Sequence, residues 1–243
     1  MSDYAIIVPA YNEEAYLPTT LATLREAMAA VSPEHGSGEL IVVDNNSHDR
    51  TAEVAREHGA DSIVFEPHNQ IARARNAGAA ATQAEHLVFV DADTAVPPSA
   101  LRQALDALAS GEVVGGGARV AMDREVTPTV AWIVRTWEWI SIRLRYAAGS
   151  FFFVRRDAFE AVGGFDEAVY AGEEVWFGRR VKTWARKRRL GFVILADPPV
   201  VTSGRKSDWY STKDFLLQIA IILFIPWAGR SKRLCAMWYR RPE

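Results

Sequence analysis

The first hundred residues alternate short apolar runs with segments of helical character, and few folds accommodate such an alternation. Each apolar run has the length of a buried strand rather than of a helix. The four runs are residues 5–9, 39–43, 62–65 and 87–90. The segments between them, which are predicted to be helices, are residues 14–31, 50–58 and 71–84. This β-α-β-α-β-α-β order predicts an α/β fold with a single doubly wound, mostly parallel sheet that is flanked by helices.

The rest of the chain continues the pattern less regularly. Further strands are predicted at 113–120, 149–154 and 190–195, and helices at 99–109, 128–147, 156–162 and from residue 173 onward. The 243 residues are enough for one large or two small domains. Residues 206–243 differ in composition from what precedes them, and we expect them to form a C-terminal helical tail.

Charge is distributed unevenly along the chain, although the net charge is only −2. Residues 1–174 carry a net charge of −13 and residues 175–243 a net charge of +11. Such asymmetry indicates either an anionic partner for the basic part or two segments that neutralise each other by packing together. The basic part has no nucleic-acid recognition motif, so we do not expect nucleic acid to be that partner.

The tail combines an apolar run with basic residues and tryptophan. Residues 215–225 are strongly apolar but too few for a bilayer-spanning helix, which needs about 20 apolar residues. A short apolar helix beside Lys, Arg and Trp is typical of a peripheral membrane anchor. A homodimer interface or a lid over the core would explain the same composition. The start of the chain lacks a signal peptide and Cys235 is the only cysteine, so we expect a cytoplasmic location, with membrane contact at the inner face.

Polar residues follow the predicted strands where each strand leaves the sheet. Asp91 and Asp93 come directly after the fourth apolar run, at the edge where open α/β sheets bind ligands. Two carboxylates on one loop can hold Mg²⁺ or Mn²⁺, with a diphosphate filling other coordination positions. The alternative is that Asp-x-Asp only ends a strand, because Asp favours turns.

Two common nucleotide-binding motifs are missing from this arrangement. No G-x-G-x-x-G follows the first predicted strand, which argues against a dinucleotide-binding Rossmann protein. No G-x-x-x-x-G-K-[ST] occurs either, which argues against a P-loop NTPase. The remaining features are the carboxylates, which can hold a metal, and the arginines of Arg73-Ala74-Arg75-Asn76. Together they favour a site for a nucleotide diphosphate.

The order and spacing of these segments resemble the successive motifs of family 2 glycosyltransferases, which have the GT-A fold. The resemblance covers residues 4–205. The segments that carry it are Val8-Pro9-Ala10-Tyr11-Asn12-Glu13-Glu14, Val42-Val43-Asp44-Asn45-Asn46-Ser47 with Asp49 and Thr51, Arg73-Ala74-Arg75-Asn76-Ala77-Gly78, Asp91-Ala92-Asp93, Gly163-Gly164-Phe165-Asp166 and Glu173-Glu174.

The resemblance implies a glycosyltransferase that moves a sugar from a nucleotide-diphosphate sugar to a carbohydrate or lipid-linked acceptor, with Mn²⁺ or Mg²⁺ as cofactor. Residues 1–125 would form the nucleotide-sugar-binding half of one GT-A domain. Residues 126–205 would form its acceptor-binding half, and residues 206–243 the tail. The sugar, the nucleotide and the acceptor are not specified by these motifs.

Within the first half, the resemblance assigns several residues to the nucleotide. Pro9, Tyr11 and Glu13 would line the nucleotide pocket, and Asp44 would hydrogen-bond the base. The alternative for Asp44 is a helix N-cap.

The same resemblance assigns the arginines and the two aspartates. Arg75, with Arg73, would face the nucleotide and its diphosphate, which suits the bidentate fork of arginine. Asp93 would bind the metal directly, and Asp91 would contact the ribose or the metal. The alternative for both arginines is a solvated helix face.

Glu174 aligns with the last acid of the Glu-Asp motif that supplies the base in inverting members of the family. Such a carboxylate takes the proton of the acceptor hydroxyl as that oxygen attacks the anomeric carbon. Glutamate in place of aspartate lengthens the side chain, and Glu173 is a second candidate for the base. A carboxylate pair at a helix start would serve as a simpler explanation. A nucleotide-sugar-binding protein without catalysis and a retaining transferase therefore stay open as alternatives.

A later element of some family members has no direct counterpart here. Because no histidine follows His86, a histidine metal ligand from the C-terminal part is excluded. Arg205 or Lys206 could instead close over the diphosphate. The alternative is that both lie in a solvated loop.

Overall fold

The computed structural model describes residues 2–124, 141–205 and 228–235, together with Trp132, Arg135, Thr136 and Trp139. The predicted helical tail at 206–243 lies largely outside these residues, as does most of the predicted helix at 128–147. Within the described part of the chain, no helix is long and apolar enough to cross a membrane.

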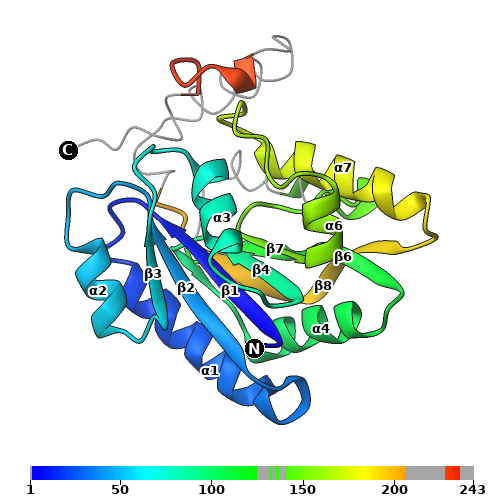
Figure 1. The fold of residues 1–243 in the computed structure, drawn as a ribbon, viewed down its shortest axis with the longest axis horizontal. Helices are drawn as coiled ribbons and strands as arrows, with labels where there is room; N and C mark the ends of the chain where they lie inside the picture. The colour runs from blue at the N-terminus through cyan, green and yellow to red at the C-terminus, as the bar shows by residue number, and fades with distance from the viewer. Residues whose placement is uncertain are drawn as a thin grey trace.

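One curled sheet of eight strands runs through the described residues, with helices on both faces (Figure 1). Its order is β3-β2-β1-β4-β7-β6-β8-β5. The strands are β1 (Tyr4–Ala10), β2 (Gly38–Asp44), β3 (Ser62–Phe65), β4 (His86–Val90), β5 (Thr94–Ala95), β6 (Val113–Met122), β7 (Phe151–Arg155) and β8 (Gly191–Thr202). Strands β3, β2, β1 and β4 are parallel, and β7 is antiparallel to both β4 and β6.

Alternation of side chains along the central strands divides the core into two layers. In β1, Ile6 and Val8 point to one layer, whereas Ala5 and Ile7 point to the other. Both sets are fully buried because helices cover both faces, so the strand is apolar throughout instead of alternating with polar residues. This explains why the sequence shows short continuous apolar runs.

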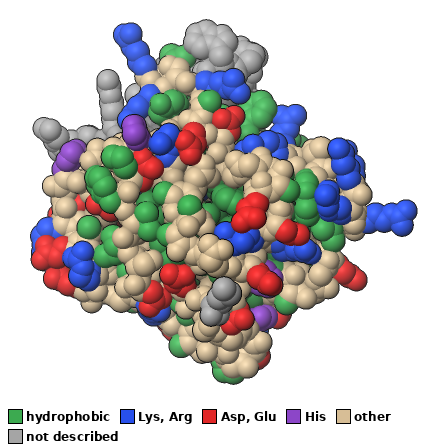
Figure 2. All heavy atoms as spheres, in the orientation of Figure 1, with side chains coloured by type: hydrophobic (Ala, Val, Ile, Leu, Met, Phe, Trp, Pro, Cys, Tyr) green, Lys and Arg blue, Asp and Glu red, His purple; other side chains and the backbone are tan. Residues whose placement is uncertain are grey.

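The helices divide between the two faces of the sheet. The first layer is covered by α1 (Leu17–His35), α2 (Thr51–Glu57) and α4 (Pro98–Ala109). The second is covered by α3 (Ile71–Ala80), α6 (Arg156–Ala161) and α7 (Glu173–Arg186). In the space-filling view, basic side chains gather over the edge of the molecule where α7 lies (Figure 2).

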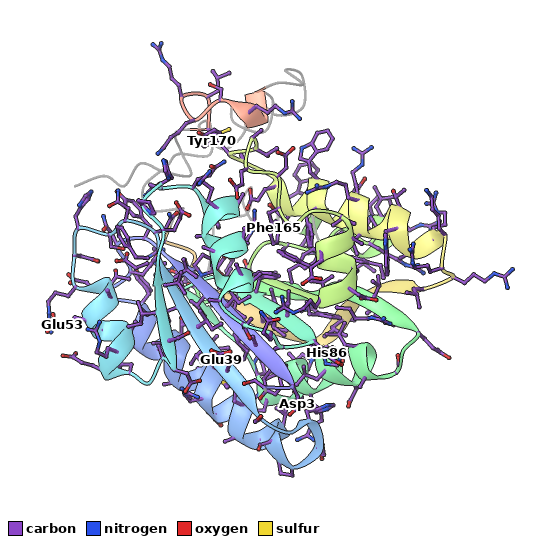
Figure 3. The ribbon with its side chains drawn as sticks, in the orientation of Figure 1. Asp3, Glu39, Glu53, His86, Phe165 and Tyr170 are labelled. Carbon is purple, nitrogen blue, oxygen red and sulfur yellow. The ribbon has the colours of Figure 1, made fainter. Side chains whose placement is uncertain are left out.

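The parallel register brings the ends of three strands together. Ala10 of β1 lies beside Asp44 of β2, and β4 joins the other side of β1, so the loops after these three strands share one edge of the sheet. Labelled side chains show the two ends of the sheet: Asp3 and His86 lie at the starts of β1 and β4, whereas Phe165 and Tyr170 lie toward the opposite end (Figure 3).

Strands β5 and β8 bring a distant segment to that edge. Thr94 pairs with Thr202 in antiparallel register, one residue after Asp93. Strand β8 was predicted to end near residue 195, but it continues to Thr202, and the short β5 was not predicted. The extension of β8 brings residues 203–205 beside the loop that carries Asp91 and Asp93.

Helix α3 lies unusually close to the sheet because it has a glycine at the contact. A Cβ at Gly78 would clash with Cγ2 of Ile7 and would lie 2.9 Å from Cγ2 of Val43. By contrast, a Cβ at Gly178 in α7 would make ordinary contacts of 3.7–4.0 Å with Phe152 and Phe192. The same substitution should therefore have opposite effects in the two helices.

We expect Gly78→Ala to lower the free energy of unfolding by about 1–3 kcal/mol, because the β-branched side chains beneath it must shift. We expect Gly178→Ala to raise it by about 0.5–1 kcal/mol, because alanine is the better helix former and has room there. Urea unfolding of the two variants and the parent measures both effects. Equal effects of the two variants would contradict this account of α3 packing.

Candidate active site

The loops after β1 and β2 are joined by hydrogen bonds. The Asn12 backbone N–H donates to the Ser47 hydroxyl (3.0 Å), and the Glu13 N–H donates to the Thr51 hydroxyl (2.7 Å). The ring of Tyr11 meets the ring of His48 edge-on at a centroid distance of 6.5 Å. The loop after Pro9, which was predicted to line a nucleotide pocket, therefore has a fixed position over the end of β2.

Asp44 ends β2 and is nearly buried. Its carboxylate accepts the Ser47 backbone N–H at 2.9 Å, which shapes the loop, and it caps no helix. The next residue, Asn45, accepts the Gln70 backbone N–H (2.8 Å) and donates to the His68 carbonyl (2.6 Å). These bonds fix the start of α3 beside Asp44.

Helix α3 also reaches the segment that precedes α7. The Asn76 side chain accepts the Phe165 N–H (2.9 Å) and donates to the Phe165 carbonyl (3.0 Å). The Gln70 side chain donates to the carbonyls of Glu167 (2.6 Å) and Val169 (3.0 Å). Two motifs that lie about ninety residues apart in the sequence are thus part of one structural unit.

Arg75 lies at the centre of this unit and is 1% exposed. Its Nη1 donates to Glu173 Oε1 at 2.7 Å, and its Nη2 donates to Asp91 Oδ1 and to the Gly149 carbonyl, both at 3.0 Å. Its guanidinium lies 5.2 Å from the centre of the Phe165 ring. The burial of Arg75 overturns the alternative of a solvated helix face for this residue.

The charges around Arg75 explain its ionisation. Burial alone would lower the pKa of Arg75, but the Asp91 and Glu173 carboxylates outweigh burial and raise it. The guanidinium is therefore a permanent cation between two carboxylates. A buried cation of this kind is stable only when it is paired and hydrogen-bonded, as here.

Glu173 and Glu174 occupy the first turn of α7, after Gly172 at φ 73°. Glu173 is buried, which raises its pKa, while Arg75 opposes that rise. Two neighbouring carboxyl groups in this environment repel each other when both are ionised, so one of them keeps its proton. Because Glu173 pairs directly with Arg75, the proton belongs mainly to Glu174.

Burial, and then the negative charge of Glu173, raise the pKa of Glu174 to about 8. A carboxyl group with such a pKa accepts and releases protons near neutral pH, as a general base must. Strongly shifted carboxyls cluster at functional sites, so this value identifies Glu174 as a functional candidate independently of any motif.

A second arginine, Arg205, holds the other part of the site. Its Nη1 and Nη2 donate to the two carboxylate oxygens of Glu13 at 2.8 and 2.6 Å, and Nη2 also lies 3.0 Å from Asp93 Oδ2. The guanidinium lies 4.3 Å from the centre of the Tyr16 ring. Arg205 is 5% exposed, so the alternative of a solvated loop is wrong for it, and Lys206 lies outside the described residues.

The chemistry of the donor set decides whether a divalent metal fits. Asp91 and Asp93 offer hard oxygen ligands, and no group of three or more His, Cys, Asp or Glu side chains suited to a metal occurs in the part of the chain that the structure describes. Mg²⁺ and Mn²⁺ sites commonly use one or two carboxylates together with substrate phosphates. The residues therefore fit a divalent cation that arrives with a diphosphate.

An open pocket of about 450 Å³ lies between the start of α3, the loop after β2 and the segment before α7. Arg73 lines it and is held by Glu167 at 2.6 Å. Lys232 also lines it and donates to the Asn69 carbonyl at 3.0 Å. Arg73 therefore faces a different space from Arg75, two residues away on the same helix.

Residues 228–235 lie against the segment before α7. The Tyr170 N–H donates to the Gly229 carbonyl at 2.5 Å, and Arg230 lies 3.6 Å from Asp166 (Figure 3). Cys235 is buried, and burial with the nearby Glu173 charge raises the pKa of its thiol. The C-terminal segment thus extends to the vicinity of the two glutamates.

Two clusters account for most of the residues that the sequence singled out. Asp91, Arg75, Glu173 and Glu174 form one, and Glu13 and Asp93 form the other around Arg205. Sequence reasoning missed Asn45 and Gln70, which position the helix, and the pairing of Arg205. Asn45 follows Asp44 directly and belongs to the same motif segment, so its place at a strand end and in that motif were the signals available.

Comparison of the fold with solved structures identifies one fold class. The structure of S. aureus TarS residues 1–349 in complex with UDP-GlcNAc has a TM-score of 0.66 at 18% identity, covering 91% of this chain and 67% of that one. The mannosyltransferase PcManGT from Pyrobaculum calidifontis, in complex with GDP-Man and Mn²⁺, has a TM-score of 0.64 at 20% identity, covering 99% and 65%. The described fold is the GT-A fold.

The sequence comparison is consistent with the fold. The model of the family "Glycosyl transferase family 2" matches residues 5–163, which is more than half of the chain. The probable glycosyltransferase YdaM of Bacillus subtilis is 24% identical over 218 residues, which cover 82% of this chain and 49% of that protein. The chain belongs to glycosyl transferase family 2, and it spans about half the length of the curated relatives it matches.

We expect Arg75→Ala to lower the free energy of unfolding by about 3–5 kcal/mol, because it leaves two carboxylates without their buried partner. The matched control is Arg73→Ala, which removes an arginine whose ion pairs are partly exposed and should cost less than about 1 kcal/mol. Urea unfolding compares the two. Similar losses would show that Arg75 is not the central ion pair.

The raised pKa of Glu174 predicts a stability effect with a defined sign. Between its ordinary value near 4.5 and about 8, the folded state binds the proton more tightly than the unfolded state, so this group destabilises the fold as pH rises. Glu174→Gln keeps nearly the same side-chain shape but carries no charge at any pH. We expect its free energy of unfolding to match the parent at pH 5 and to exceed it by about 1 kcal/mol or more at pH 9. A pH-independent difference would contradict the assignment.

Proposed function

We propose that the chain transfers a sugar from a nucleotide-diphosphate sugar to an acceptor hydroxyl with inversion at the anomeric carbon. The observation that carries this proposal is a carboxyl of raised pKa, Glu174, next to the buried Arg75–Glu173 ion pair, whose arginine also holds Asp91 at the end of β4. Membership of the family and the nucleotide sugars bound by the compared structures support it.

The donor would lie over the carboxyl ends of β1, β2 and β4. In this proposal Pro9 and Tyr11 line the nucleotide pocket, and Asp44 hydrogen-bonds the base. Asp44 suits this role because the Ser47 N–H occupies only its Oδ1, and its Oδ2 makes no hydrogen bond among the described residues. Asp91 would contact the ribose or the metal at the edge of the same space, where its side chain is 29% exposed.

Arg75 and Arg73 would contribute to donor binding in different ways, because one is buried and the other is partly exposed. Arg75 is buried, so we propose that it orients Asp91 and Glu173 and places positive charge beneath the donor. Arg73, which is about one third exposed, would reach the nucleotide from the pocket side. Glu13 holds Arg205 by both of its oxygens, so its contribution to the nucleotide pocket would be made through that arginine.

We propose Mn²⁺ or Mg²⁺ as the cofactor, held by Asp93 and Asp91 together with the donor diphosphate. Bound there, the cation would stabilise the negative charge of the departing diphosphate. The Ser203 N–H donates to the Asp93 backbone carbonyl at 3.1 Å, which holds the loop that carries Asp93 in place.

Glu174 would act as the base, with Glu173 as the group that sets its pKa. The acceptor oxygen forms a bond to the anomeric carbon, and its proton passes to the Glu174 carboxylate. The bond between the anomeric carbon and the diphosphate oxygen breaks, and the nucleoside diphosphate leaves with that electron pair. Because Glu174 keeps its proton at neutral pH, the Glu173–Glu174 pair would carry less negative charge and would repel an anionic donor less.

We propose that residues 1–125 bind the donor and residues 126–205 bind the acceptor within one domain. The acceptor would be a carbohydrate or a lipid-linked sugar acceptor. Membrane contact through 206–243, at the inner face in a cytoplasmic setting, and a homodimer through the same tail are the two proposals for that segment, most of which lies outside the described residues.

We expect Glu174→Gln to lower the rate of transfer by at least about 100-fold while nucleotide binding stays within about twofold, because only the proton acceptor is lost. Glu160→Gln, on the exposed face of α6, is the matched control and should keep full activity. A panel of UDP, GDP and TDP sugars with Mn²⁺, read by thermal shift and by nucleotide release, identifies the donor first.

The parent enzyme should show a kcat/KM that rises with pH through an apparent pKa near 8, because the base must be ionised. Nucleotide binding without transfer, unchanged in Glu174→Gln, would indicate a binding protein instead. Retention of the anomeric configuration, determined by NMR of the product, would replace the inverting mechanism. No binding to any donor would refute the proposal.

A further inference from the structure

The guanidinium of Arg205 lies where a metal ligand is proposed. Its Nη2 is 3.0 Å from Asp93 Oδ2, while the other oxygen of Asp93 accepts the Thr202 hydroxyl at 3.3 Å. Both oxygens of Asp93 therefore already have a partner within the described residues. A cation that binds Asp93 directly must compete with the positive charge that is already there.

Arg205 is held more firmly by Glu13 than by Asp93, so it could exchange its partner Asp93 for another group. Its two parallel bonds to Glu13, at 2.8 and 2.6 Å, form the bidentate arrangement that is strongest for an arginine and a carboxylate. Only Nη2 is shared with Asp93. Arg205 can give up Asp93 while it keeps both bonds to Glu13 and its place against the Tyr16 ring, 4.3 Å away.

The backbone that leads to Arg205 is held in place by contacts that do not involve the Arg205 side chain. The β5–β8 pairing and the Ser203 N–H bond to the Asp93 carbonyl fix the backbone two residues before Arg205. The Gly204 N–H donates to Asp123 at 2.9 Å. The backbone can therefore stay in place while the side chain changes partner.

We propose that Arg205 is a resident counter-ion of Asp93 which a divalent cation displaces, so that Arg205 suppresses metal binding until a diphosphate supplies further ligands. Displaced from Asp93 but still held by Glu13, the guanidinium retains a donor for an anionic group beside the metal. Arg205 is in this sense a positioning residue that couples the binding of metal and nucleotide.

This inference rests on the proposed function, because it takes Asp93 as a metal ligand. A purely structural role for Arg205 would also explain its burial. The two differ in one measurable respect: a structural arginine has no effect on how tightly the folded protein binds Mn²⁺ when nucleotide is absent.

The test titrates Mn²⁺ alone into the full chain and follows free Mn²⁺ by electron paramagnetic resonance. We expect Arg205→Gln to bind Mn²⁺ at least tenfold more tightly than the parent, because no cation then has to be displaced. Arg25→Gln is the matched control: it removes the same charge from an arginine of α1 that pairs with Asp61 at 2.7 Å and does not contact Asp93, and its affinity should stay within twofold of the parent. Asp93→Asn should abolish the gain in the Arg205→Gln background.

A second arm repeats the titration with saturating UDP or GDP. The parent should bind Mn²⁺ at least tenfold more tightly than without nucleotide, and Arg205→Gln should show a smaller increase, because part of the coupling is gone. If Arg205→Gln does not fold, Arg205→Lys replaces it, since a single ammonium cannot hold both Glu13 oxygens and Asp93, and a gain of at least threefold is expected.

Three results would overturn the inference: an unchanged Mn²⁺ affinity in a folded Arg205 variant, an equal gain in Arg25→Gln, or a gain that survives Asp93→Asn. Failure of the proposed function would look different. In that case no nucleotide sugar binds or turns over in the parent, whereas the nucleotide-free titration still reports whether Arg205 and Mn²⁺ compete for Asp93.

Discussion

The buried ion pairs of Arg75 are the interaction on which the arrangement of the site depends. This guanidinium joins α3 to the end of β4 through Asp91, to the start of β7 through Gly149, and to α7 through Glu173. These elements come from both predicted halves of the domain. Because Arg75 and Glu173 are both buried, removing either one leaves an uncompensated charge, so the position of α7 relative to the sheet is tied to the ionisation of this pair.

The single positive charge of Arg75 cannot neutralise all the carboxyl groups that surround it. Asp91, Glu173 and Glu174 supply three carboxyls for one guanidinium, and the most economical solution is to keep one of them protonated. Glu174 is that group, because Glu173 takes the direct bond to Arg75. The raised pKa of Glu174 thus follows from the count and geometry of its neighbours, and a carboxyl in this position is costly for stability and useful for proton transfer. Around Asp93 the same problem is solved differently, with Arg205 shared between two carboxylates.

Part of this candidate site could be predicted from the sequence because Asp44, Asp91 and Asp93 follow apolar strands, whereas Arg75, Glu173 and Glu174 were assigned through the resemblance to the family. The short runs before Asp44 and Asp91 fix strand ends, and parallel pairing then brings those ends together. The environment of Arg205 could not be predicted in this way. Its partner Glu13 is 192 residues away, and their contact depends on β8 continuing past Asp197 and Pro198 to pair with β5, a strand of two residues with no apolar period. The burial of Arg75 was equally hidden, because an arginine on an alanine-rich helix has the composition of a solvated face.

The uneven charge of the chain can also be interpreted through these contacts. From the basic part, Arg205 pairs with Glu13 and Asp93, and Arg230 lies near Asp166, so these two cations neutralise acidic residues of the first 174. Mutual neutralisation is therefore part of the explanation for the charge asymmetry. It does not account for the basic side chains of α7, which gather on the surface (Figure 2). The charge of the C-terminal part thus serves two purposes: the buried Arg205 balances carboxylates of the site, and exposed basic residues remain available to an anionic surface or partner.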